Sequence, residues 1–329
     1  MTEMLKAGEG SSKHEDMRNG HDQHKIYSYN TYHTYMQQCR YFTEYIKEVH
    51  PECTTLRAAE KYVPEFMDYR CSQTDTHGKP LSAWTLQTQS KALNKLYSIK
   101  PGDKYYYEPP VRHREDIIRS RLDTAQDKHF SKSNNDEFIK FCQGTGCRRN
   151  VIEKLHGEDM LTREQLDQKI ADLANKEVLT IAQEKDLTAL QDAVENFPDQ
   201  SHFIHHMNDK GGRDRYAPII GPAKEQIIER FQKTSAQEKV WQHVPKNADI
   251  HGYRGDYATA IYKLYARSID QIPYDRINKG THFRYQSDVY VCRKDENGRK
   301  LDRVAMIKGS KALGHNRDCI IATNYLRGL

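Results

Sequence analysis

Six residues whose side chains can bind phosphate, move protons or act as nucleophiles occur in order between residue 148 and residue 325. Arginine offers a planar, permanently charged pair of donors to an anion, and histidine gains and loses a proton near neutral pH. A tyrosine hydroxyl becomes a nucleophile once its proton is removed. A single arginine or histidine near a turn is usually a surface or capping residue, so the order is the informative property. The six are Arg148, Lys210, His251, Arg254, His315 and Tyr325.

Short motifs surround these residues. Thr145-Gly146-Cys147-Arg148 follows a predicted helix, Lys210 lies in a Gly-rich turn, and His251-Gly252-Tyr253-Arg254 opens another predicted helix. Leu313-Gly314-His315 comes next, and Tyr325 lies ten residues after the histidine. In this order the motifs resemble the tyrosine recombinase superfamily, although each motif alone is weak. The resemblance covers most of residues 26–325, and the insertions resemble those of integrases from integrative conjugative elements of Gram-positive bacteria.

The resemblance implies an enzyme that cuts and rejoins DNA through a 3′-phosphotyrosine on Tyr325, without a metal, ATP or another cofactor. Displacement at a phosphodiester passes through a crowded, doubly negative state, which fixed cations aimed at the non-bridging oxygens stabilise. Arg148 and Arg254 would hold these oxygens, because guanidinium is bidentate toward phosphate whereas lysine is a looser point charge.

The resemblance assigns proton transfer and charge stabilisation to three further residues. His251 would accept the tyrosine proton, since a hydroxyl with a pKa of about 10 needs a base at neutral pH. His315 would donate a hydrogen bond to a phosphate oxygen. Lys210, on a mobile hairpin, would protonate the leaving 5′-oxygen.

Two positions depart from the family pattern. Val151 stands where the family has an acidic residue, three positions after the first arginine, and this leaves open which carboxylate braces the site. After Arg254, Gly255-Asp256 replaces the more familiar His-Thr. Asp256 could orient a catalytic partner or cap the helix, and we favour the cap.

The chain divides into a tail and two domains in this interpretation. Residues 1–25 are polar, and we expect them to be disordered. Residues 26–108 predict a helical, SAM-like core DNA-binding domain, and residues 109–329 predict a mainly helical catalytic domain with a small antiparallel sheet, the DNA breaking-rejoining fold. We place the boundary at Glu108-Pro109-Pro110, because adjacent prolines lack the backbone N–H groups that a helix needs as hydrogen-bond donors and favour an extended backbone. Together the two domains would form a clamp around duplex DNA.

Periodicity and capping signals predict the elements. In the first domain we expect helices over 32–49, over 54–70 with a break at Pro64, and after Ser82. In the second, Ser133 caps a helix that ends near Gly144, and Thr162 and Thr180 begin the two helices of a hairpin insertion over 160–198. We expect a β-hairpin over 202–220, helices over 222–233 and 253–266, and a strand pair, 288–292 with 301–307, within an insertion over 267–308.

The two insertions could be surface additions without a chemical role. Alternatively, they contact other molecules. In that case we expect the arginine- and lysine-rich strand pair to contact DNA and the acidic helical hairpin to contact protein.

Basic residues outside the six are candidates for DNA contact. The net charge of +5 and the pI near 8.6 permit a polyanionic partner without requiring one. A helix after the boundary carries four arginines, and a solvated linker helix is an equal alternative for it. The candidates are Arg112, Arg114, Arg119, Arg121, Lys91, Lys95, Arg213 and Arg215.

Several classes of protein and site are disfavoured. The chain has no apolar run of the roughly 18 residues needed to span a bilayer, and its first residues lack the apolar core of a signal peptide, so we expect a cytoplasmic protein, which the resemblance implies is bacterial. The seven cysteines show no CxxC pair, so we expect reduced packing residues. A metal site at His202, His205 and His206 is disfavoured, because no arrangement of cysteines or carboxylates accompanies them. In addition, neighbouring residues on a strand face opposite sides of the sheet.

By resemblance, the partners are double-stranded recombination sites, three further copies in a synaptic homotetramer, and an excisionase. Relatives carry a helix after the nucleophile that docks into the next subunit, whereas four residues follow Tyr325 here. The sequence leaves open truncation or assembly through other surfaces. Two rival functions also stay open. One is a type IB topoisomerase, which relaxes supercoils without exchanging partners, and the other is a catalytically silent DNA-binding protein.

Overall fold

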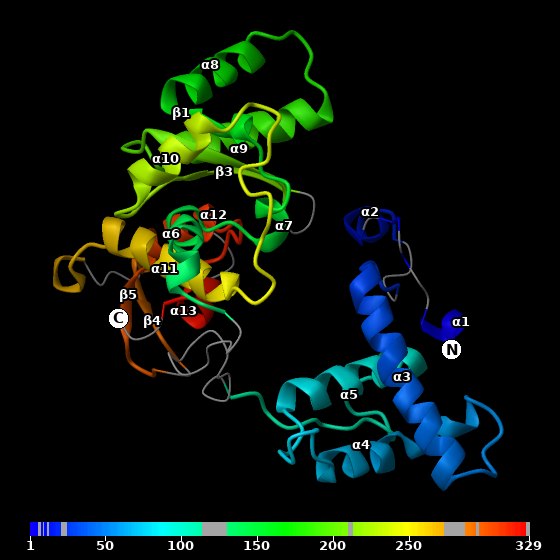
Figure 1. Ribbon diagram of the computed structural model, residues 1–329. Helices are drawn as coiled ribbons and strands as arrows, with labels where there is room; N and C mark the ends of the chain where they lie inside the picture. The colour runs from blue at the N-terminus through cyan, green and yellow to red at the C-terminus, as the bar shows by residue number, and fades with distance from the viewer. Residues whose placement is uncertain are drawn as a thin grey trace. The chain divides into compact units, whose positions relative to one another are not determined.

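The computed structural model describes residues 1–5, 8, 10–11, 13–20, 25–113, 130–209, 213–272, 287–293 and 296–326. The chain forms two compact units, Met1–Asp116 and Ile117–Leu329 (Figure 1). The described residues are mainly helical with small antiparallel sheets, as the periodicity predicts at this coarse level. Within these residues no helix combines the length and the apolar character that crossing a bilayer requires.

The first unit is helical. Ser82 caps a helix by accepting the N–H of Thr85, as the sequence predicts, and Ser28, which was not predicted as a cap, starts the longest helix by accepting the N–H of Thr31. The segment expected to be one helix broken at Pro64 contains a short 3-10 helix and then α4, whose first turn holds the proline where its missing N–H costs little. The elements are α1 (Thr2–Leu5), α2 (Lys13–Arg18), α3 (Tyr29–Val49), η1 (Ala58–Tyr62), α4 (Val63–Ser72) and α5 (Ala83–Tyr97).

Two short helices lie where the composition predicts a disordered tail. Leu5, at the end of α1, is fully buried in the same cluster as Phe42 and Leu93. Asp16 in α2 accepts hydrogen bonds from Lys25 and from the hydroxyl of Tyr27. One buried leucine and one paired carboxylate thus tie this stretch to the first unit, which average polarity alone does not reveal.

The second unit is built around a three-stranded antiparallel sheet in the order β1-β2-β3. The strands are β1 (Met160–Thr162), β2 (His202–Asp209) and β3 (Arg213–Pro218). In the register of these strands, His206 lies opposite Arg215 and Asp209 lies opposite Arg213. The two paired residues are three positions apart in β2 but only two positions apart in β3. One extra residue in β2 therefore makes a β-bulge beside the turn.

Helices pack around this sheet. The long α11 lies against α6 and α12, and the hydroxyl of its fully buried Tyr257 donates to the carbonyl of Pro218. The helices are α6 (Asp136–Thr145), α7 (Arg149–Ile152), α8 (Arg163–Ala174), α9 (Ile181–Asn196), α10 (Lys224–Lys233), α11 (Ile250–Tyr265), α12 (Arg303–Ala312) and α13 (Asp318–Asn324), with 3-10 turns η3 (Ser133–Asn135), η4 (Gly157–Asp159) and η5 (Ile269–Gln271).

The helical hairpin α8–α9 belongs to the core. Both predicted capping boxes form, Thr162 with Gln165 and Thr180 with Gln183. α9 packs against β3 and α12, and Leu190 is fully buried in the main cluster of the unit. The insertion predicted over 160–198 is therefore part of the core of the second unit.

The second predicted strand pair is shorter than expected. β4 (Val289–Val291) pairs with β5 (Lys300–Asp302), but the expected strand over 301–307 is wrong beyond residue 302. Asp302 accepts the N–H of Val304 and starts α12, so this N-cap ends the strand. An overlooked cap likewise starts α11 at Ile250, because Asp249 accepts the N–H of Gly252.

Candidate active site

Five of the six predicted catalytic residues lie on described segments of the second unit. Arg148 is the N-cap residue of α7, and His251 and Arg254 lie in the first turns of α11. His315 lies between α12 and α13, and Tyr325 ends α13. Lys210, which follows β2 in the sequence, lies outside the described residues.

Arg254 joins two of these segments. Its guanidinium is 2% exposed and donates to the carbonyl oxygens of Gly146 and Leu313. The loop that carries Arg148 and the loop that carries His315 are therefore held against the same side chain. Burial, and then the positive charges of Arg215 and Arg148, lower the pKa of Arg254 to about 10, so it is fully charged near neutral pH.

Gly146 permits this close approach. It ends α6 in the left-handed region, with φ of +59°, and a Cβ at this position would overlap the ring of Tyr257. A residue with a side chain would therefore be strained by its backbone and would displace a fully buried neighbour. Gly146 therefore sets the direction in which the chain leaves α6, and with it the position of Arg148 two residues later.

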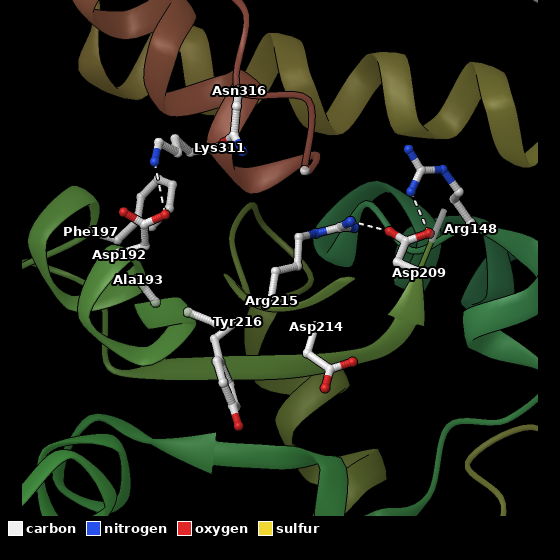
Figure 2. A pocket seen from close by; sticks show the side chains of 12 residues that line it. Arg148, Asp192, Ala193, Phe197, Asp209, Asp214, Arg215, Tyr216, Lys311 and Asn316 are labelled. Carbon is white, nitrogen blue, oxygen red and sulfur yellow. Dashed lines mark hydrogen bonds and ion pairs between the residues drawn. The ribbon is translucent and has the colours of Figure 1, made fainter. Parts of the chain in front are cut away.

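Asp209, at the end of β2, is the carboxylate of the site. It is 3% exposed and forms ion pairs with Arg148 through one oxygen and with Arg215 through the other (Figure 2). The sequence singled out neither this carboxylate nor its pairing with Arg148. Val151, the position of the expected acidic residue, is buried in an apolar cluster instead.

A buried histidine continues this network. His206 Nδ1 lies 2.7 Å from Nη2 of Arg215, and its Nε2 lies 3.7 Å from Cys147 Sγ. Arginine can only donate, so Nδ1 accepts and the ring proton is on Nε2, facing the sulfur. Burial, and then Arg215 and Arg254, hold the pKa of His206 well below 6.5, so the ring is neutral. Burial raises the pKa of the Cys147 thiol to about 11, which keeps it protonated.

Tyr325 contacts two histidines. Its hydroxyl lies 3.0 Å from Nε2 of His315, which is hydrogen-bonding distance, and its ring centroid lies 5.5 Å from that of His251. The backbone N–H of His315 donates to the carbonyl of Ser310, which fixes the loop between α12 and α13. His251 is the predicted base, and the hydrogen bond between His315 and the hydroxyl places a second imidazole within reach of the phenol proton.

A cavity of ≈ 80 Å³ opens beside the arginine–aspartate network (Figure 2). Arg148 and Arg215 line one side, and Asp192 and Lys311, which pair at 2.8 Å, line another. Pockets for drug-sized ligands enclose about 300–1,000 Å³. This cavity is too small for such a ligand, and its charged lining suits a single anionic group at the rim of the site.

The predicted DNA contacts fall into three groups. The side chain of Arg215 is 11% exposed and pairs with Asp209, which also pairs with Arg148. In the first unit, Lys91 and Lys95 border a groove of ≈ 480 Å³ together with Lys25 and Lys100, and Arg112 lies over the ring of Trp84. The side chain of Arg213 and all of Arg114, Arg119 and Arg121 lie outside the described residues.

Asp256 does not cap α11. It lies in the second turn and accepts a hydrogen bond of 2.8 Å from Gln143 of α6, so it ties two helices together, and Asp249 is the cap. The favoured interpretation of Asp256 was therefore wrong. Within the part of the chain that the structure describes, no three His, Cys, Asp or Glu side chains gather as metal ligands.

No model of a known protein family matches the chain, and no curated protein matches it. The order of the motifs and the geometry of the residues they contribute therefore remain the indications of function.

Proposed function

We propose that the chain is a tyrosine recombinase that cleaves and rejoins DNA at specific sites through a covalent bond between Tyr325 and a 3′-phosphate. The observation that carries the proposal is the hydrogen bond between Tyr325 and His315, beside an arginine that contacts both the Arg148 loop and the His315 loop. The charge of Arg254 interacts with both Tyr325 and Arg148, so a phenol, an imidazole and two guanidinium groups from separate segments are linked, which suits phosphoryl transfer.

Each group has a role in cleavage. Tyr325 Oη attacks the scissile phosphorus and forms the O–P bond while the bond to the 5′-oxygen breaks. Geometry favours His315 as acceptor of the phenol proton, and His251 then steadies the ring and the phosphate. Arg148 and Arg254 stabilise the negative charge that develops on the non-bridging oxygens. Lys210 delivers the proton to the departing 5′-oxygen.

Rejoining reverses these steps with a new 5′-hydroxyl as the attacking group, so that no external energy source is consumed. The biological reaction in this proposal is integration and excision of a mobile element by a homotetramer on two duplex sites, helped by an excisionase, in the bacterial cytoplasm. The lysine-bordered groove of the first unit supports backbone contact with DNA, because such contacts are mainly electrostatic.

The test uses nicked duplexes with a randomised central segment, in which cleavage releases a short fragment and traps the covalent intermediate. Wild-type protein is expected to form adducts that survive denaturant and to enrich one sequence. Tyr325→Phe is expected to form none and to bind the enriched duplex as wild type does. Tyr265→Phe, which removes a hydroxyl bonded to Asp199 elsewhere in the unit, is the matched control and should still react.

The two rival functions give other outcomes. A topoisomerase would relax supercoiled plasmid without exchanging strands between two copies of the enriched site. If wild-type protein bound duplex DNA but formed no adduct with the pool or with plasmid, the silent DNA-binding function would replace this proposal.

A further inference from the structure

Asp209 uses both oxygens on arginines. One oxygen pairs with Arg148, which is 21% exposed and so accessible to a substrate, and the other pairs with Arg215, which is 11% exposed. Arg215 is in turn held by its hydrogen bond to His206 Nδ1. The chain of contacts therefore runs from a fixed, buried arginine through the carboxylate to the accessible one.

The β-bulge brings Asp209 into this position. Side chains alternate between the two faces of a strand, so residues three apart, such as His206 and Asp209, would normally face opposite sides. Both are nevertheless buried, at 0% and 3% exposure. The extra residue in β2 between these two pairs restores the inward direction at Asp209.

The carboxylate also offsets a concentration of like charge. Arg148, Arg215 and Arg254 are close enough for each positive charge to affect the others, and the pKa of Arg254 is lowered by the first two and raised by Asp209. A neutral residue at 209 would leave these cations to repel each other, and the one with the most exposed side chain, Arg148, would move outward most easily.

We propose that Asp209 is the positioning residue that aims Arg148 at the scissile phosphate. The inference depends on the proposed function. Asp209 takes the bracing role that Val151, which is buried in an apolar cluster, cannot fill.

The first experiment measures the rate of covalent adduct formation on the enriched nicked duplex at saturating DNA. Asp209→Asn keeps the shape and removes the charge, and we expect the rate to fall about 100-fold, as when one preorganised donor is lost. Asp302→Asn is the matched control, because Asp302 is also fully buried and paired with an arginine, Arg267, away from the site. It should lower Tm but react within about threefold of wild type once folded.

A second pair of variants separates positioning from a merely structural role. If Asp209 acts through Arg148, Asp209→Asn should slow Arg148→Ala by less than about threefold. A methylphosphonate at the scissile position carries no charge on the phosphate and needs less cationic stabilisation. On this substrate the defects of Asp209→Asn and Arg148→Ala should shrink in parallel, which a loss of folded protein would not produce.

Three results would overturn the inference. The first is an Asp209→Asn rate equal to wild type. The second is a full 100-fold effect of the same change in the Arg148→Ala background. The third is a defect unchanged on methylphosphonate. If the wild type forms no adduct, the proposed function fails, and a double-mutant cycle on Tm between Asp209→Asn and Arg148→Gln then decides the pairing. Additive shifts would refute it, and a smaller combined loss than the sum would support it.

Discussion

His315 Nε2 lies 3.0 Å from the hydroxyl of Tyr325, although the two residues stand at opposite ends of α13. The seven-residue helix is short enough for its two flanking residues to meet over one side of the site. A hydrogen bond of this length lets an imidazole take the phenol proton directly. His251 faces the same ring with a centroid separation of 5.5 Å.

We expect His315→Ala to slow covalent adduct formation by about 10²–10⁴-fold, the usual value for a general base. His251→Ala should slow it less, because that ring packs beside the tyrosine. Single-turnover rates on the nicked duplex measure both. A larger loss for the His251 variant would return the role of base to His251.

Arg254→Lys tests whether the planar, two-armed guanidinium of Arg254 is required. Lysine keeps the charge but cannot bond Gly146 and Leu313 in the same geometry, so we expect at least about a 100-fold loss of rate. The free energy of unfolding should fall by about 1.5–3 kcal/mol, because a buried charge-assisted hydrogen bond is lost. Urea denaturation and adduct kinetics check these values, and a fully active, equally stable variant would contradict them.

Gly146→Ala should destabilise the protein by about 2–5 kcal/mol, since positive φ costs about 1–2 kcal/mol and overpacking against Tyr257 about 1–3 kcal/mol more. Gly298→Ala is the matched control. Its φ is +85° with no neighbour within 4 Å, so only the backbone cost remains. Equal losses of Tm for the two variants would show that Tyr257 gives way without cost.

His206 should make the fold sensitive to acid. Its pKa in the folded protein is held well below 6.5, so below pH of about 6.5 the unfolded chain binds a proton that the folded protein does not. The contribution to stability is complete above that pH and is lost as pH falls, by about 1.4 kcal/mol per pH unit.

We expect His206→Gln, which keeps an acceptor for Arg215, to reduce this dependence between pH 7.5 and 5.5, in a comparison of urea midpoints. The lowered pKa values of His202 and His205 contribute equally in both proteins, so the difference isolates His206. Parallel pH profiles would contradict the expectation.

Leu190→Ala tests whether the helical hairpin is part of the core. The side chain is fully buried against the sheet, and its loss should cost about 2–5 kcal/mol. Val178→Ala, at the exposed tip of the same hairpin with 83% exposure, should change stability by less than about 0.5 kcal/mol. A tolerant Leu190 site would restore the interpretation of the hairpin as an addition to the surface.

Local chemistry made part of the structure predictable. Ser82, Thr162 and Thr180 are caps whose partners lie within three residues, so the sequence contains the whole interaction. The resemblance also predicted that Tyr325 lies near His251 and His315.

Other features depend on distant residues. Asp302 ends β5 and starts α12, but the same residues continue a strand pattern until a cap is recognised. Asp209 meets Arg148 only because β2 and α7 pack together, 61 positions apart by number (209 − 148). Arg215 resembles a surface cation by its type, and only the buried carboxylate shows otherwise.

The bulge in β2 has a consequence for how this gene can vary. A substitution at Met207, which is 37% exposed, leaves the number of residues between His206 and Asp209 unchanged. Loss of that single codon would remove the bulge and leave His206 and Asp209 two residues apart, a spacing at which regular alternation also puts both side chains on one face. Related sequences should therefore vary in both residue type and length at this position while keeping the carboxylate on the face of the histidine, so that a one-residue gap in an alignment here would mark a regular strand in place of the bulge.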